Sequence, residues 1–292
     1  LNDVDGILDL ESALSSVKQD DSNNVDATPI EDILVKAYLS TQQYDKALVI
    51  ANQWKVSKEN SIKGFMLSGA IHLQQENPEA ARNAFHGALN QEPNNPRIKM
   101  ALISLEPTTN NEELKAHLSS INKLIDEHPD FIPALLKQYL LEKRLAQPIT
   151  TIDQLLSLIQ ADPENKLYPV ILGQIYTVEK QPEQAITQFE SVLTDTAQPF
   201  WQALSKNYQE TKQFEKFVNL NKKWLEQYPN NPNALLGNAI ALESRGDTQE
   251  ALKLTNKYIN ELEGSRIELK LMHIHLLIKT QQFELAQEQF NE

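Results

Sequence analysis

The stretch LGQIYTVEKQPEQAITQF, residues 172–189, predicts two short helices separated by a turn. It places two small residues, Gly173 and Ala185, beside two large ones, Tyr176 and Phe189. A helix that needs only one apolar face would accept any mix of Leu, Ile and Val. Two antiparallel helices approach closely only where their side chains are small. We therefore expect Gly173 to face Ala185, with Tyr176 and Phe189 filling the space beside that pair.

The same pattern occurs 104 residues earlier, in FMLSGAIHLQQENPEAARNAFHGALNQEP, residues 65–93. That distance is close to three times 34. Small residues recur near the same interval over most of the chain, and the first and last are separated by seven steps that average 34 residues. These residues are Ala47, Ala81, Ala185, Ala251 and Ala286. Pro78 and Pro182 stand at the first turn of a predicted helix, where the missing N–H costs nothing.

This recurrence resembles the tetratricopeptide repeat, a helix–turn–helix unit of 34 residues, over roughly residues 28–292. Only eight glycines occur in 292 residues, and no alternating β pattern is present. The resemblance implies an all-α fold, a right-handed superhelical solenoid of about eight helix–turn–helix repeats. One repeat cannot bury its apolar face alone, so neighbouring repeats stack into a continuous core.

The predicted organisation is an acidic, partly helical N-terminal lead-in at 1–27, followed by the solenoid at 28–292. The lead-in holds seven acidic side chains and one Lys, which is typical of a solvated segment. The repeats at 96–131 and 132–165 are degenerate, and the stretch LEPTTNNEEL (105–114) contains an insertion. The repeat at 198–231 carries Phe217 where the small residue is expected. The other repeats are expected at 28–61, 62–95, 166–197, 232–266 and, truncated, 267–292.

The composition excludes several classes of function. A net charge of −13 argues against binding to nucleic acid or to an anionic membrane surface. No cysteine occurs, so disulfides and Cys-based zinc sites are excluded. The longest apolar runs, such as LLGNAIAL (235–242), are too short to span a membrane. The sequence has no initiator Met and stops within a helical pattern, so we expect it to be an excerpt of a longer protein.

Residues for catalysis or metal binding do not converge in any motif. No phosphate-binding loop, nucleophile elbow or zinc-protease motif is present. His273 and His275 lie two residues apart on a predicted helix and so point to different faces. Glu112 and Glu113 follow an Asn at a predicted helix start, where acidic side chains favour the helix dipole. We therefore expect no enzymatic activity, no cofactor and no bound metal.

The candidate protein-binding groove comes from the resemblance, because concave-face residues in such repeats lie on the first helix of each unit. Positions 5 and 9 of the repeats give fourteen residues, eight of them apolar, and all except Asp32 and Lys36 are taken as candidates. They are Met66, Ala70, Leu136, Leu140, Val170, Gln174, Gln202, Lys206, Leu236, Ile240, Leu271 and His275. The clustered basic residues that hold a terminal carboxylate in the chaperone-tail class are missing. We expect the groove to take an amphipathic helix or an extended apolar segment. The alternative is that tight curvature buries these side chains as additional core.

Three functions fit this reading. The first is a non-catalytic scaffold for protein–protein interaction. The second is a regulatory or substrate-recruiting arm of a larger enzyme, and the third is a structural component that oligomerises. The partner is expected to be a protein or peptide, and self-association is left open.

The stretches ILVKAYLSTQQYDKALVIANQW (33–54) and FVNLNKKWLEQYPNNPNALLGNAIAL (217–242) also resemble the bacterial repeat lipoproteins of exosortase and PEP-CTERM systems. That resemblance implies a periplasmic or cell-envelope location and a role in exopolysaccharide production or protein sorting. The absence of cysteine is compatible with such a location but does not establish it.

Overall fold

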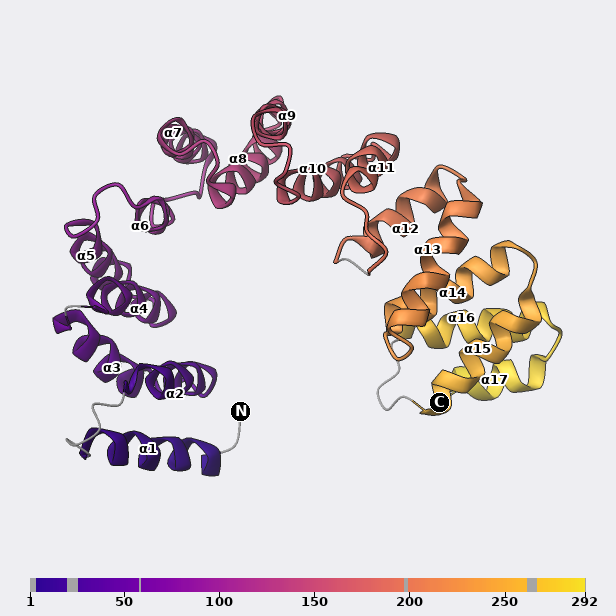
Figure 1. Cartoon of the computed structure of the whole chain (residues 1–292), viewed down its shortest axis with the longest axis horizontal. Helices are drawn as coiled ribbons and strands as arrows, with labels where there is room; N and C mark the ends of the chain where they lie inside the picture. The colour runs from indigo at the N-terminus through magenta and orange to yellow at the C-terminus, as the bar shows by residue number, and fades with distance from the viewer. Residues whose placement is uncertain (1–3, 20–25, 58, 197–198, 262–266, 292) are drawn as a thin grey trace. The chain divides into compact units, whose positions relative to one another are not determined.

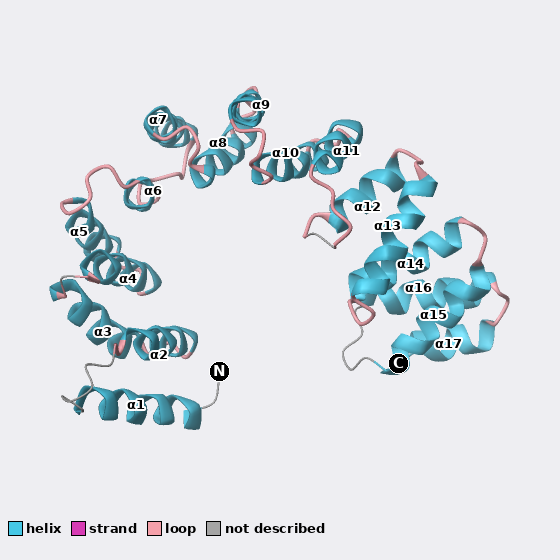
Figure 2. Ribbon diagram, in the orientation of Figure 1, coloured by secondary structure: helices cyan, strands magenta, loops and turns pink. Residues whose placement is uncertain are grey.

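The computed structural model describes residues 4–19, 26–57, 59–196, 199–261 and 267–291, and in these residues every regular element is a helix (Figures 1 and 2). Parts of the predicted lead-in (1–3 and 20–25) and the repeat ends at 197–198 and 262–266 lie outside the described residues. Two compact units divide the chain at residues 151 and 152, close to the start of α9.

In the described residues, sixteen of the helices follow one another in eight pairs, and each pair corresponds to one predicted repeat, although α4 begins one residue before the predicted start at 62. The helices of the first four pairs are α2 (Thr28–Ser40), α3 (Tyr44–Val56), α4 (Ser61–Gln74), α5 (Pro78–Leu89), α6 (Pro96–Ile103), α7 (Asn111–Glu127), α8 (Ile132–Arg144) and α9 (Thr151–Ala161). The helices of the last four are α10 (Leu167–Val178), α11 (Pro182–Ser191), α12 (Trp201–Glu210), α13 (Phe214–Gln227), α14 (Pro232–Ser244), α15 (Thr248–Glu261), α16 (Ile267–Lys279) and α17 (Phe283–Asn291). The prediction of an all-helical fold built from helix–turn–helix repeats is confirmed.

Within each compact unit, most helices that are neighbours in sequence are also in contact. The two helices of a pair contact each other, as α4 does α5 and α10 does α11 (Figure 1). The second helix of a pair also contacts the first helix of the next, as α3 does α4 and α13 does α14. The degenerate repeat at 96–131 keeps this order with a shortened α6 of 8 residues and a lengthened α7 of 17.

The close approach within a pair depends on a glycine and an aromatic ring. A β-carbon added at Gly173 would lie 2.6 Å from the Phe189 ring, and one added at Gly69 would lie 2.2 Å from the Phe85 ring. Both distances are far below van der Waals contact, so only glycine fits at either position. The sequence predicts that Gly173 faces Ala185. In the structure, the atoms nearest to a β-carbon at Gly173 belong to Phe189 instead. Ala185 and Phe189 are both fully buried.

The turn inside most pairs contains one residue in the left-handed conformation. These residues recur at intervals of 32 to 35 from Ala146 onward, and the first two are 34 apart. They are Gln42, Glu76, Ala146, Lys180, Lys212, Gly246 and Gln281. The following N–H donates to a carbonyl five residues back, for example from Gln181 to Tyr176 at 2.8 Å. This is the Schellman ending of a helix, which satisfies carbonyls that the helix itself leaves free.

Helix α1 (Val4–Gln19) belongs to the folded array rather than preceding it. Its Ile7 is buried in one cluster with residues of α2 and α3. The Tyr38 hydroxyl and the Lys46 ammonium both donate to Glu11 Oε1, each at 2.7 Å.

An identical arrangement joins two complete repeats in the second unit. The Tyr208 hydroxyl and the Lys216 ammonium both donate to Glu190 Oε1, again at 2.7 Å. Glu190 lies on α11, the second helix of its repeat, whereas Glu11 lies on α1. Helix α1 thus gives α2 and α3 the contacts that the second helix of a preceding repeat would give.

The turn residues lead to a first prediction. Because a left-handed conformation costs a non-glycine residue roughly 1–2 kcal/mol, we expect Glu76→Gly to stabilise the chain by about 1 kcal/mol. The increase should be measured as a higher urea midpoint. The matched control is Gln75→Gly, because the adjacent residue has a φ of −86° and gains nothing from glycine. The reciprocal change, Gly246→Ala, should lower the midpoint, since Gly246 has a φ of +88°. Equal effects of glycine at 75 and 76 would contradict the prediction.

The carboxylates of Glu11 and Glu190, each bonded by a tyrosine hydroxyl and a lysine ammonium, lead to a second prediction, on the pH dependence of stability. The hydrogen bonds from Lys46 and Tyr38 hold the pKa of Glu11 below its ordinary value of 4.5. Burial raises the pKa of Glu190, but the hydrogen bonds from Lys216 and Tyr208 outweigh burial and leave that pKa below 4.5. A carboxylate with a lowered folded pKa stabilises the fold above its unfolded pKa. That stabilisation is lost as the pH falls through the folded value.

The check is the urea midpoint at about pH 6 and about pH 3, on either side of the ordinary carboxyl range. Glu11→Gln and Glu190→Gln should lower the midpoint at the higher pH and should show a smaller loss on acidification than the unmodified chain. Asp9→Asn, an exposed change on the same helix α1, serves as the control for removing one charge. If the urea midpoint of both Gln variants falls as much on acidification as that of the unmodified chain, the hydrogen bonds to Glu11 and Glu190 do not stabilise the fold.

Candidate protein-binding groove

The first helices of the second unit form a contiguous row. Helix α12 contacts both α10 and α14, and α14 also contacts α16. Each of these helices has one buried side, which contains Leu172, Leu204, Leu235 or Leu276, all at most 1% exposed. Consecutive first helices in contact therefore present one shared face.

All twelve candidates from the sequence lie on first helices, and all are at least partly exposed. The pairs are Met66 and Ala70 on α4, Leu136 and Leu140 on α8, Val170 and Gln174 on α10, Gln202 and Lys206 on α12, Leu236 and Ile240 on α14, and Leu271 and His275 on α16. Leu140 is 60% exposed and Leu271 is 53% exposed. Large apolar side chains with this exposure are not core residues in this structure. Whether they bind a partner stays a prediction.

Four of the candidates come together in one cleft of about 130 Å³ between α12 and α14, which we call the α12–α14 cleft. Helix α12 gives it a polar wall, and Leu236 and Ile240 of α14 give it an apolar wall. The residues that line it are Gln202, Ser205, Lys206, Gln209, Phe217, Asn221, Trp224, Asn233, Leu236, Gly237 and Ile240. The other eight candidates do not line this cleft.

The floor of the cleft contains a buried polar pair. Asn221 on α13 is completely buried, and its Nδ2 donates to Ser205 Oγ at 2.7 Å and to the Phe217 carbonyl at 2.8 Å. Its Oδ1 has no hydrogen-bond partner among the described residues. A buried acceptor left without a donor costs about 1–3 kcal/mol. The repeat therefore has a buried acceptor beside the α12–α14 cleft that the fold leaves without a donor.

Ser205 and Asn221 stand where other repeats have a glycine and a phenylalanine. The two residues are sixteen positions apart, as are Gly69 and Phe85. The hydrogen bond between them thus replaces the ring-on-glycine contact. Sequence reasoning missed this pair, although the unexpected Phe217 one turn earlier was a signal that the packing of this repeat differs.

Gly237 on α14 makes room for the unpartnered oxygen. A β-carbon added at Gly237 would lie 2.1 Å from Asn221 Oδ1. The glycine is therefore required by an atom of the preceding repeat, unlike Gly69 and Gly173, which accommodate a ring of their own repeat. The sequence alone does not distinguish these two uses of glycine.

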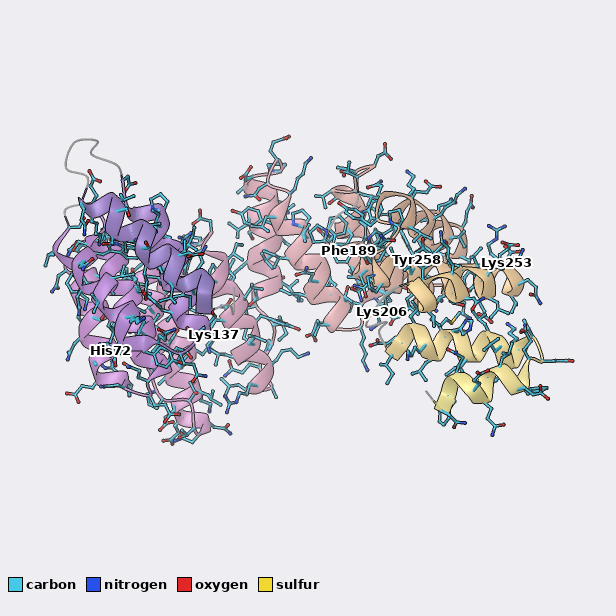
Figure 3. The ribbon with its side chains drawn as sticks, turned by 90° about the horizontal axis from the view of Figure 1, so that it is seen from below. His72, Lys137, Phe189, Lys206, Lys253 and Tyr258 are labelled. Atoms are coloured by element: carbon cyan, nitrogen blue, oxygen red, sulfur yellow. The ribbon has the colours of Figure 1, made fainter. Side chains whose placement is uncertain are left out.

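Lys206 is the one charged residue among those lining the α12–α14 cleft, and it can be located in Figure 3. Its ammonium lies 3.8 Å from Glu210, and both side chains are well exposed. An exposed ion pair of this kind contributes little to stability. The exposed Lys206 ammonium is therefore the positive charge at the edge of the cleft, and the other lining residues are uncharged.

Two of the six histidines are buried. His273 is buried, its Nδ1 lies 2.8 Å from the Thr255 hydroxyl, and burial lowers its pKa, whereas His275 is exposed. His117 is also buried, and burial lowers its pKa. Within the described ranges, no three His, Cys, Asp or Glu side chains are grouped so that they could hold a metal ion.

Two further expectations concern the helices themselves. Asn110 caps α7 by accepting from the Glu113 N–H at 2.9 Å, and the Glu113 carboxylate accepts from the Thr109 N–H at 2.7 Å. The acidic pair at 112 and 113 thus belongs to a helix start, as expected. None of the helices in the described part of the chain is long and apolar enough to cross a membrane.

The chain is similar in structure to a tetratricopeptide repeat protein from Parabacteroides merdae ATCC 43184. The TM-score is 0.51 at 14% sequence identity, and the match covers 79% of this chain and 91% of that chain. This chain has the tetratricopeptide-repeat fold. Weaker similarities, with TM-scores of 0.49 and 0.46, join it to the Cut9–Hcn1 hetero-tetramer of the APC/C and to the human IFIT1 dimer with PPP-AAAA.

The identity to these two proteins is 14% and 15%. The matches cover 93% and 100% of this chain, and 53% and 72% of the other chains, respectively. No protein-family model and no curated protein matches the sequence. At such low identity the similarity concerns the fold and carries no function with it.

The geometry at Gly237 leads to a third prediction. Gly237→Ala should destabilise the chain by about 1–3 kcal/mol, the usual cost of forcing a methyl group into a packed site, because the new β-carbon collides with Asn221 Oδ1. The measurement is the urea midpoint. Ala70→Ser, on an exposed first-helix position, should change it little. A neutral effect of Gly237→Ala would mean that Asn221 does not hold this position.

Proposed function

We propose that this repeat protein is a non-catalytic scaffold that binds an apolar or amphipathic protein segment on the exposed face of its first helices. The observation that carries the proposal is the contiguous row of first helices in the second unit, which opens into the α12–α14 cleft at positions predicted from the sequence. Of the candidate residues, Leu140 on α8 is 60% exposed and Leu271 on α16 is 53% exposed.

The chemistry of the face supports binding rather than catalysis. A catalytic site requires a nucleophile, a base and a group that orients them within hydrogen-bond reach. The α12–α14 cleft offers amides, one hydroxyl and a lysine, and the hydroxyl of Ser205 is already engaged with Asn221. Amides and apolar side chains are instead the groups by which proteins recognise peptide segments. The cell-envelope location and sorting role are a further proposal that rests on the sequence resemblance alone.

The fourth prediction concerns the exposed leucines of α8. Leu136→Glu with Leu140→Glu should leave the free energy of unfolding within about 0.5 kcal/mol, because exposed substitutions rarely cost more. Thermal unfolding of the double variant is the measurement. A loss of many degrees would show that the two leucines act as core.

The binding role is tested with peptides selected from a random display library against the intact chain. Selected peptides should bind at least about tenfold more weakly to Leu136→Glu/Leu140→Glu or to Leu236→Glu/Ile240→Glu, a cost of about 1.4 kcal/mol. The control is Val49→Glu/Val56→Glu, which adds the same charges at exposed positions of the second helix α3. If no peptide distinguishes either first-helix variant from this control, the proposed function is wrong.

A further inference from the structure

We propose that the surface of α2 and α3 under helix α1 is a binding site for an amphipathic helix of a partner protein, and that α1 occupies this site as an internal competitor. We call this surface the α1 site. It lies at the start of the first compact unit and not on the exposed face of the first helices. The inference is therefore independent of the proposed function.

Helices α1 and α11 present the same residues at the same spacing. The stretches are ILDLESAL (7–14) and ITQFESVL (186–193). Each has an Ile, an apolar residue three positions later and a Glu four positions later, which places the three side chains on one side of a helix. Ile7 and Ile186 are both buried. Two helices with otherwise different sequences therefore share one stripe, which we call the Ile–Glu stripe.

The residues that receive the glutamate are also the same at both places. In addition to the two hydrogen bonds to each carboxylate, the ammonium of Lys46 lies 5.3 Å from the centroid of the Tyr38 ring, and that of Lys216 lies 5.6 Å from the Tyr208 ring. A tyrosine hydroxyl and a lysine ammonium that converge on one oxygen bind a carboxylate by charge-assisted hydrogen bonds. The α1 site therefore selects for the Ile–Glu stripe rather than for one particular sequence.

Helix α1 is held much more weakly than α11. Helix α11 contacts both α10 and α12 and buries Ala185, Ile186 and Phe189. Among the described side chains of α1, only Ile7 is buried. The Lys46 and Glu11 side chains are 51% and 31% exposed, and ion pairs with such exposure contribute little. An element with so few buried apolar contacts opens at a lower free energy than the core, so α1 is displaced more easily than the helices inside the array.

The residues under α1 define what a competing helix must carry. Ile7 is in one cluster with Leu34 and Tyr38, so these residues need an apolar cover. Glu31 is buried, and it pairs with Lys18 of α1 at 2.7 Å. Removal of α1 takes this cation away, and a buried carboxylate without its cation is costly. The competitor therefore needs the Ile–Glu stripe and a Lys or Arg seven positions after the Glu, as Lys18 follows Glu11.

The occupant is a different protein rather than a second copy of this chain. A tethered helix has an effective concentration of about millimolar, so the identical α1 of a second copy does not displace it at micromolar concentration. A competitor must fit better than α1. Helix α11 shows how, because it has Phe189 where α1 has Leu10, and an aromatic ring buries more apolar surface. Phe189 stacks on Phe200, and Ile30 stands at the corresponding place 170 residues earlier.

The probe is a fluorescein-labelled peptide with the sequence of residues 4–19 and phenylalanine in place of Leu10, which we call the Phe peptide. A hydrocarbon staple joins the positions of Ser12 and Ser16, both exposed in α1, so that the peptide is helical in solution. Binding to the intact chain is measured by fluorescence anisotropy. The Phe peptide should bind at least about tenfold more tightly than the same peptide with leucine at that position.

The role of α1 as competitor is tested with Glu11→Lys, which places a second ammonium beside Lys46 and releases α1. This variant should bind the Phe peptide at least about tenfold more tightly than the unmodified chain, because more of its sites are free. Asp9→Lys, the same change at an exposed position of α1, should leave the affinity unchanged. In the unmodified chain, the Phe peptide should speed up hydrogen exchange of α1 but not of α10.

A charge reversal locates the peptide on the chain. The second peptide is the Phe peptide with lysine in place of Glu11. On the unmodified chain the glutamate form should bind about tenfold more tightly, and Lys46→Glu should reverse this preference. Both peptides are compared on the same variant, so a change in its stability does not alter the comparison. Lys123→Glu, an exposed change on α7, should leave the preference as it is.

The contrary results are distinct from one another. If the Phe peptide binds none of the chains, or binds without a reversal in Lys46→Glu, the α1 site is wrong. If Glu11→Lys and the unmodified chain bind it equally, α1 is not a competitor. If the unmodified chain sediments as a dimer at micromolar concentration and the peptide dissociates it, the occupant is a second copy and the assignment to a different protein is wrong. The display selection with the first-helix variants tests the proposed function separately.

Discussion

The ring of Phe189 lying directly on Gly173 is the contact from which the rest of the architecture follows. Because the glycine has no side chain, the aromatic ring can occupy the space between two helices that are joined by only three residues. A pair so joined still has apolar surface on its outer sides, which is covered only when the next pair stacks against it. Phe189 shows this coupling, because its ring also stacks in parallel on Phe200 of the following repeat, with ring centroids 5.1 Å apart.

The turns impose the second constraint, because each pair must reverse the chain within a few residues. Three of them use the same side chains: a threonine closing the first helix accepts a hydrogen bond from a glutamine two residues later, as Gln43 Nε2 donates to Thr41 Oγ1 at 3.0 Å. The same contact joins Gln213 to Thr211 and Gln282 to Thr280. In each of these turns, the residue between the threonine and the glutamine takes the left-handed conformation. The local polar contacts help to hold a backbone conformation that glycine would adopt without cost.

The sequence was sufficient for the fold because its repeat signal comes from paired small and large residues, and such pairing is a direct consequence of helix packing. It was insufficient for features that depend on a neighbouring repeat. The role of Glu11 could not be found, because its partners Tyr38 and Lys46 lie on other helices and α1 has no glycine–aromatic signature. The polar pair of Ser205 and Asn221 was hidden for the same reason. Each residue alone is ordinary in a helix, and only their separation of sixteen positions reveals that they replace a glycine and a phenylalanine.

That replacement explains why the α12–α14 cleft lies where it does. An asparagine is smaller than the phenylalanine whose position it takes, so less side-chain volume fills the space between α13 and α14 at this point. The hydrogen bond to Ser205 compensates for burying the amide nitrogen, but the amide oxygen gains no partner from the fold. A compact globular core would spread such a packing change through many neighbours. In a repeat array each unit contacts only its neighbours, so the loss stays local and the surrounding repeats keep their packing. The repeat at 198–231 therefore gives up part of its apolar core, and a buried polar pair takes the place of the aromatic ring.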